Sequence, residues 1–76
     1  MNDARRKSID EALAQIEGGK GILESVRDEE QETYDNMPEA FQSGEKGEKA
    51  QAAIDALEEA INACDEIVSN LETAKE

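Results

Sequence analysis

The 76-residue sequence contains no histidine or tryptophan, and only one cysteine, one proline, one tyrosine and one phenylalanine. Without histidine, a Ser–His or Cys–His catalytic pair is excluded, and so is the Glu-x-x-His element of a di-metal helical bundle. Because Cys64 is the single cysteine, no disulfide can form within the chain. With no histidine either, a zinc site of the usual Cys and His ligands is nearly excluded. We therefore expect a protein with no enzymatic activity, no metal site and no cofactor.

Long apolar stretches are also lacking, because the longest uninterrupted runs are two or three residues. Such runs are far too short for a membrane-spanning helix. Met1 leads into a charged segment and not into the apolar region of a signal peptide. The expectation is a soluble cytoplasmic protein of a bacterium or of a phage-infected cell.

Basic residues are few, and the formal net charge is −12. Acidic and basic side chains balance within residues 1–20, so the whole excess of negative charge lies after residue 20. A chain of this charge repels nucleic-acid phosphates, so direct nucleic-acid binding is not expected. The same charge attracts basic surfaces, including those of proteins that themselves bind nucleic acid.

The clearest pattern that is present lies in residues 44–75. Apolar residues there alternate in steps of four and three, which is a heptad seam: Ala50, Ile54, Leu57, Ile61, Cys64, Val68 and Leu71. A second row follows beside the seam at seven-residue intervals: Ala53, Ala60, Ile67 and Ala74, with Ala56 and Ala63 beyond. The combined apolar face covers about half of the helix circumference, which is wider than one neighbouring helix needs.

A first helix is predicted over residues 3–35, where apolar residues recur at helical spacing: Ile9, Leu13, Ile16, Leu23 and Val26, with Ala12, Ile22 and Tyr34 beside them. Two starts of this helix are possible: an N-cap at Asn2 or Asp3, or a capping box that begins at Ser8. Gly18, Gly19 and Gly21 interrupt it at about 1 kcal/mol each. We expect a continuous helix, because the apolar phase is kept from Ile16 to Leu23.

The glycine cluster suggests that another helix packs close to the backbone there. A phosphate-binding loop is a poor interpretation, because the full G-x-x-x-x-G-K-[ST] spacing is missing and no apolar strand comes before it.

The connector between the two helices contains Pro38, which disfavours helical geometry at the residue before it. A single helical turn is expected at residues 38–41, with Met37 and Phe41 folding back to close the end of the structure. Ser43 is the candidate N-cap of the second helix.

These patterns predict an all-α fold: an antiparallel helical hairpin, with helices at about 3–35 and 44–75, forming a single domain over residues 1–76. So short a chain has little interior, and oligomerisation is the remaining way to stabilise it. We expect self-association into a helical bundle, with a homodimer as the simplest form and a trimer or tetramer as the alternative. The expected oligomer interface consists of Ile54, Leu57, Ile61, Cys64, Ile67, Val68 and Leu71.

The densest negative charge lies at the end of the first helix, where acidic residues oppose the helix dipole. A run that is unfavourable for local stability suggests a use in binding. The candidate partner-binding residues are Asp28, Glu29, Glu30, Glu32, Tyr34, Asp35 and Met37.

The segment from Arg27 to Ile61, RDEEQETYDNMPEAFQSGEKGEKAQAAIDALEEAI, resembles the signature of a family of small acidic proteins in bacterial and phage genomes. Its most distinctive part is Tyr34–Glu39. The resemblance implies a helical hairpin and a mobile-element origin, and it implies no particular activity.

Three functions remain open at this point. The leading hypothesis is a non-enzymatic interaction protein that binds a basic host protein, such as a nucleic-acid-binding or defence protein. The alternatives are a structural oligomerisation unit and an oligomer that sequesters a small ligand near the glycine cluster or the turn.

Overall fold

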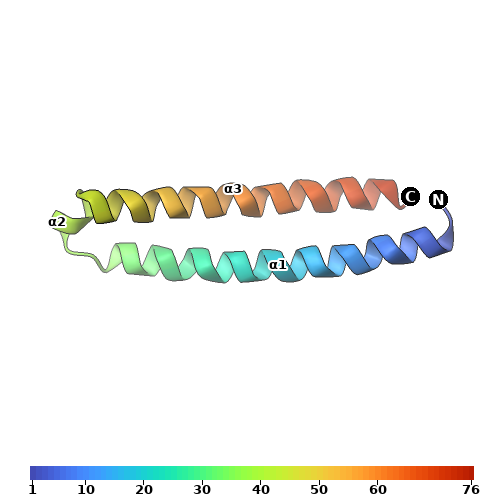
Figure 1. Cartoon of the computed structure of the whole chain (residues 1–76), viewed down its shortest axis with the longest axis horizontal. Helices are drawn as coiled ribbons and strands as arrows, with labels where there is room; N and C mark the ends of the chain where they lie inside the picture. Colours follow the sequence, from blue (N-terminus) through green and yellow to red (C-terminus); the bar gives the residue numbers. More distant parts are fainter.

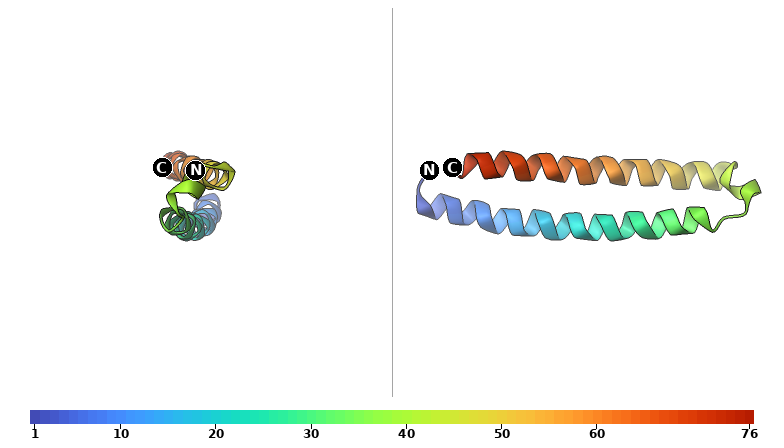
Figure 2. Two further views of the ribbon diagram at one scale, coloured as in Figure 1. Left: turned by 90° about the vertical axis from the view of Figure 1, so that its left-hand side faces the viewer. Right: turned by 180° about the vertical axis from the view of Figure 1, so that it is seen from behind.

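The computed structural model describes all residues from 1 to 76 and is built of helices alone (Figure 1). Two long helices, α1 (Asp3–Asp35) and α3 (Glu45–Ala74), run antiparallel and are joined through the short α2 (Glu39–Gln42). The molecule measures 58 × 15 × 12 Å, and its two termini lie at the same end. The end view in Figure 2 shows the two long helices side by side with no third layer. The predicted helical hairpin is therefore confirmed.

Helix α1 begins at Asp3, because the Asn2 side-chain oxygen accepts a hydrogen bond of 2.9 Å from the Arg5 backbone N–H. The helix then continues without a break through the glycine cluster, as predicted. A Cβ added at Gly18, Gly19 or Gly21 would meet nothing within 4 Å. The close helix approach expected at these glycines is thus not made by α3.

The core of the hairpin lies along the seam between α1 and α3. Its buried apolar residues are Leu13 of α1 and Ala50, Ile54 and Ile61 of α3. The other members of the α3 heptad seam are half-buried: Leu57, Cys64, Val68 and Leu71. Only 5 of the 76 residues are buried, so a single contact between two helices leaves most side chains within reach of solvent.

The α1 side of the seam differs from the predicted apolar stripe. A row of buried and half-buried residues recurs in steps of three and four from α1 to the start of the turn, and it includes charged residues: Arg6, Ile9, Leu13, Ile16, Lys20, Leu23, Arg27, Glu30, Tyr34 and Met37. The half-buried residues Ala12, Gly19, Glu24 and Gln31 flank this row. Ile22 and Val26, by contrast, are 66% and 43% exposed. Val26 therefore lies outside the seam, and the charged residues Lys20 and Arg27 are half-buried on it. Their long aliphatic stems cover apolar surface while the charged ends reach water.

The turn is organised around Gln42. Its side-chain Nε2 donates a hydrogen bond of 2.9 Å to the backbone carbonyl of Tyr34 near the end of α1. Its backbone lies directly against Gly47, which is buried in the first turns of α3. Gln42 thus connects all three helices, and the absence of a side chain at Gly47 is what allows α2 to approach α3.

Two expectations about the turn were wrong. Ser43 does not cap α3: the N-cap is Gly44, with no side-chain hydrogen bond, and the Ser43 hydroxyl instead donates to the Glu39 carbonyl at 3.2 Å. Phe41 does not fold back to close the end, because its side chain is 52% exposed with the Lys46 ammonium 5.7 Å from the ring centre. At this end of the hairpin it is Gln42, and not Phe41, that packs against α3, through its backbone at Gly47.

Neither long helix has a stretch apolar enough to cross a membrane.

We expect Gly47→Ala to destabilise the hairpin by on the order of 1–3 kcal/mol, because its Cβ would overlap the Gln42 backbone. Gly21→Ala is the matched control, since the same methyl group there meets open space. That change should stabilise the helix by about 0.5–1 kcal/mol. Urea unfolding at one fixed chain concentration measures both. Equal effects of the two substitutions would contradict the close approach at Gly47.

Candidate functional site

The seam divides the surface of the hairpin into two long sides, and two ion pairs between the helices mark one of them. The Lys20 ammonium lies 2.6 Å from a carboxylate oxygen of Asp65, and the Lys75 ammonium lies 2.8 Å from one of Asp10. Both carboxylates flank the seam on the same side, as the heptad positions of α1 and α3 require. These contacts fix the register of the two helices. They also show that Asp10 of α1 and Asp65 of α3 lie on the same side of the hairpin.

Helical periodicity places carboxylates from the full length of both helices on the side marked by the ion pairs. We call this the acidic face: Asp3, Asp10, Glu17, Glu24, Asp28 and Asp35 of α1, and Glu48, Asp55, Glu58, Asp65 and Glu72 of α3. Lys7 is the one basic residue outside the seam among them. All of these carboxylates are exposed except Glu24, which is half-buried. Much of the net charge of −12 is thus concentrated on one side.

The opposite side is made mainly of small and apolar residues. We call it the apolar face: Ala12, Gly19, Ile22 and Val26 of α1, and Ala53, Ala56, Ala60, Ala63, Ile67 and Ala74 of α3. Its charged residues are Arg5, Lys46, Lys49 and a single carboxylate, Glu29. The two sides of the hairpin therefore differ in both charge sign and polarity.

The structure distributes the candidate partner-binding residues over several surfaces. Asp28 and Asp35 lie on the acidic face, whereas Glu29 lies on the opposite side and Glu32 on the outer ridge of α1. The remaining three, Glu30, Tyr34 and Met37, are half-buried on the seam. The acidic run is therefore not one patch, and Asp28 and Asp35 share a face with carboxylates of α3 that are distant in sequence.

Both of these acidic-face residues are held by neighbours. Asp28 pairs with the Arg27 guanidinium at 3.0 Å, and Asp35 accepts a hydrogen bond of 2.9 Å from the Gln31 side chain. Asp28 keeps 71% of its side chain exposed despite this contact, so it remains available to a partner.

Six of the seven candidate oligomer-interface residues lie on the seam and face α1 of the same chain: Ile54, Leu57, Ile61, Cys64, Val68 and Leu71. Ile67 alone is exposed, at 43%. Contact between chains through α3 would therefore begin at Ile67 and its alanine neighbours, with the half-buried seam residues reached only from the side.

The end opposite the turn is fastened by Arg6 and Lys75. Arg6 Nε donates to the backbone carbonyl of Lys75 at 2.9 Å, which places a cation at the C-terminal end of α3. A positive charge there stabilises the helix dipole. The last turn of α3 has no basic residue, so Arg6 of α1 adds a positive charge beside that of the C-cap residue Lys75.

Hydrogen bonding to Asp65 raises the pKa of Lys20 above the ordinary lysine value, and the nearby charges of Asp65 and Glu24 add to this. The hydrogen bond to Asp10 raises the pKa of Lys75 in the same way. In both cases the protonated lysine is favoured in the folded chain. The two ion pairs therefore stabilise the hairpin at neutral pH.

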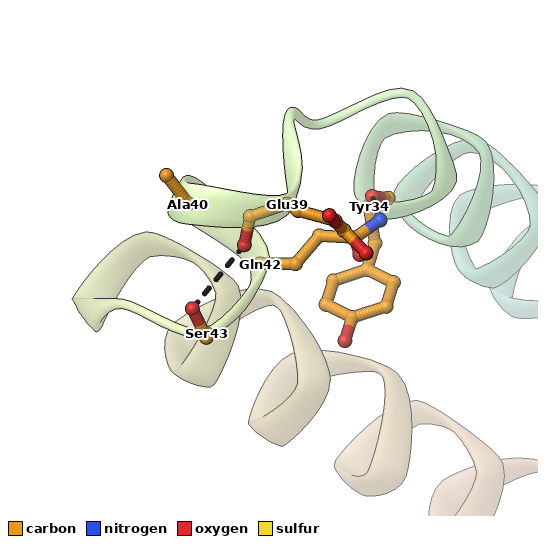
Figure 3. Close-up of a pocket in the computed structure, with 5 residues that line it drawn as sticks. All are labelled: Tyr34, Glu39, Ala40, Gln42 and Ser43. Carbon is orange, nitrogen blue, oxygen red and sulfur yellow. Dashed lines mark hydrogen bonds between the residues drawn. The ribbon is translucent and has the colours of Figure 1, made fainter.

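One shallow depression, open to solvent, lies at the turn and is lined by Tyr34, Glu39, Ala40, Gln42 and Ser43 (Figure 3). Only two of these five residues are hydrophobic, and the Ser43 hydroxyl is directed to the Glu39 carbonyl and not into the depression. The glycine cluster lines no pocket. No group of three or more carboxylate or thiol side chains is close enough together to hold a metal ion.

Comparison of the chain with protein-family models, with curated proteins and with solved structures finds no match. The features of the chain that bear on function are therefore the two faces and the turn. Of these, the acidic face is the one on which charged side chains of a single sign gather from both long helices.

We expect the Lys20–Asp65 pair to contribute stability that is complete below the ordinary lysine pKa. That contribution should disappear as the pH rises through the higher pKa of the folded state, because the lysine then loses its charge. Lys20→Met should accordingly be less stable than the parent chain at neutral pH, with the gap closing at strongly alkaline pH. Urea unfolding across this pH range measures it, and Lys7→Met is the control because Lys7 is exposed. A gap independent of pH would contradict the ion-pair account.

Proposed function

We propose that this chain is a non-enzymatic interaction protein whose acidic face binds a basic surface of a partner protein. The observation that carries this proposal is the placement of carboxylates from both helices on one side of the hairpin, with the other side nearly free of them. A charge that served only solubility would have no reason to gather on one side.

The shape of the hairpin suits a long, shallow contact. The acidic face extends along a molecule 58 Å in length, and its carboxylates recur at each heptad, about 10 Å apart along each helix. A regular line of negative charge of this kind is complementary to a basic groove or helix that normally contacts nucleic-acid phosphates. Nucleic acid itself would be repelled by the same surface.

The resemblance of Arg27–Ile61 to small proteins of bacterial and phage genomes agrees with this choice of partner. A host nucleic-acid-binding or defence protein offers the required basic surface, and a phage or mobile element gains from occupying it. Asp28 and Asp35 belong both to that segment and to the acidic face.

The test compares two variants of equal net charge. The face variant Glu24→Gln/Asp28→Asn/Asp35→Asn removes three carboxylates from the acidic face, and the ridge variant Glu11→Gln/Glu59→Gln/Glu66→Gln removes three from the outer ridges. Each serves as bait in a low-salt pull-down from host extract beside the parent chain. We expect a basic protein that is retained by the parent and the ridge variant and is lost from the face variant.

Affinity for the captured protein should fall on the order of tenfold in the face variant, if each carboxylate contributes about 0.5 kcal/mol. Binding should also weaken as salt is raised, since exposed charges are screened. Equal loss in the two variants would show that only net charge matters. No basic protein retained by the parent chain would contradict the proposal altogether.

A second proposed function is self-association, in which the hairpin serves as a structural or assembly unit. It is favoured by a separate observation: the apolar face leaves Ile22, Val26 and Ile67 between 43% and 66% exposed. Light-scattering mass in solution tests it, and a monomer at all concentrations would exclude it.

A further inference from the structure

The exposed apolar residues of the two long helices form one continuous patch. The interhelical ion pairs join residue 20 to residue 65 and residue 10 to residue 75, which fixes the antiparallel register. In this register Ile22 lies level with Ala63, Val26 with Ala60, and Ile67 with Gly19. Because all six occupy the apolar face, they form one patch near the middle of the hairpin. Ile22, Val26, Ala63 and Ile67 are exposed there, and Gly19 and Ala60 are half-buried.

The patch combines large apolar side chains with small neighbours. Ile22, Val26 and Ile67 are its large residues, whereas Gly19, Ala60 and Ala63 beside them carry no more than a methyl group. Gly19 lowers helix stability relative to alanine, and within the hairpin a Cβ there would meet nothing within 4 Å. Its small size therefore has no use inside one chain, but it would admit a side chain or helix from outside.

The exposed area of the hairpin agrees with one missing interface. A compact monomer of 8.3 kDa is expected to expose about 4,600 Å². The hairpin exposes 5411 Å², an excess of roughly 800 Å². A standard protein interface removes about this area from each partner.

The distribution of charge indicates which partner fits. Two copies of a chain with a net charge of −12 would repel one another if their acidic faces met. On the apolar face the charged residues are Arg5, Lys46, Lys49 and Glu29, so two apolar faces meet without an excess of negative charge. The same contact turns both acidic faces outward.

We infer that a second copy of this chain packs on the apolar face, giving a two-fold symmetric dimer with the form of a four-helix bundle. The inference rests on the second proposed function, self-association, and assigns to it the contact surface and the number of chains. In this dimer Ile22, Val26 and Ile67 of each copy are buried against the small residues of the other. The half-buried seam residues Leu57 and Cys64 gain cover from the same contact. One acidic face is displayed on each outer side, so the dimer is bivalent toward a basic partner.

The experiment measures mass by light scattering, under reducing conditions and over a wide range of chain concentration. The parent chain should show twice the chain mass of 8.3 kDa. Two neighbouring exposed residues then provide a matched pair: Ala63→Glu places a carboxylate on the apolar face, and Asn62→Glu places the same group on the opposite side. Ile67→Glu and Ser69→Glu form a second pair with the same geometry.

We expect Ala63→Glu and Ile67→Glu to give the monomer mass at concentrations where Asn62→Glu and Ser69→Glu remain dimeric. Helical circular dichroism on each variant separates loss of pairing from loss of folding. If a variant on the apolar face unfolds at low concentration and refolds as a dimer at high concentration, pairing through that face is still supported, because its stability then depends on association.

A dimer unaffected by both apolar-face variants overturns the assigned surface and leaves self-association standing. A trimer or tetramer overturns the assigned order. A parent chain that is monomeric throughout overturns both the inference and the second proposed function, while binding of a basic partner by the acidic face is judged separately by the pull-down.

Discussion

The contact between the α3 heptad seam and α1 holds the hairpin together and decides which side chains reach its surface. A hairpin of two helices has only one such seam, so each helix can cover one row of side chains and no more. The buried residues Leu13, Ala50, Ile54 and Ile61 lie there. Every other row faces water or another molecule. The acidic face and the apolar face are the two sides left by this geometry. Because they differ in charge and polarity, they are suited to different binding partners.

Polar contacts at the middle and both ends set the register of that seam. Lys20 with Asp65 fastens the middle, and Lys75 with Asp10 fastens the end with the chain termini. Gln42 fastens the turn through its bond to the Tyr34 carbonyl and its packing on Gly47. A seam of apolar side chains alone tolerates a shift by one heptad, whereas these pairs do not. The register in turn brings Ile22 level with Ala63 and so creates the continuous apolar patch.

The sequence was sufficient to predict the two long helices, their antiparallel order and the continuity of α1 across its glycines, because hydrophobic periodicity carries that information. It did not reveal that Lys20, Arg27 and Glu30 lie on the α1 seam, since charged residues suggest solvent. The unbroken alternation of three and four from Arg6 to Met37 was the available signal. The turn was less predictable: the positions of Phe41 and Ser43 depend on how closely Gln42 approaches Gly47, a tertiary contact with no local signature. The acidic face likewise required the pairing of the helices, because its carboxylates come from both.

We propose a hairpin with one covered seam, one face for water and basic partners, and one face for a second copy. Methyl-resolved NMR with a neutral soluble paramagnetic probe tests it most directly. Ala14 and Ala52 lie away from the apolar face, whereas Ala56 and Ala63 lie on it, and all four are exposed in the single chain. We expect the methyl groups of Ala56 and Ala63 to become protected from the probe as chain concentration rises, while those of Ala14 and Ala52 stay accessible. Equal accessibility of the four methyl groups at every concentration would contradict it.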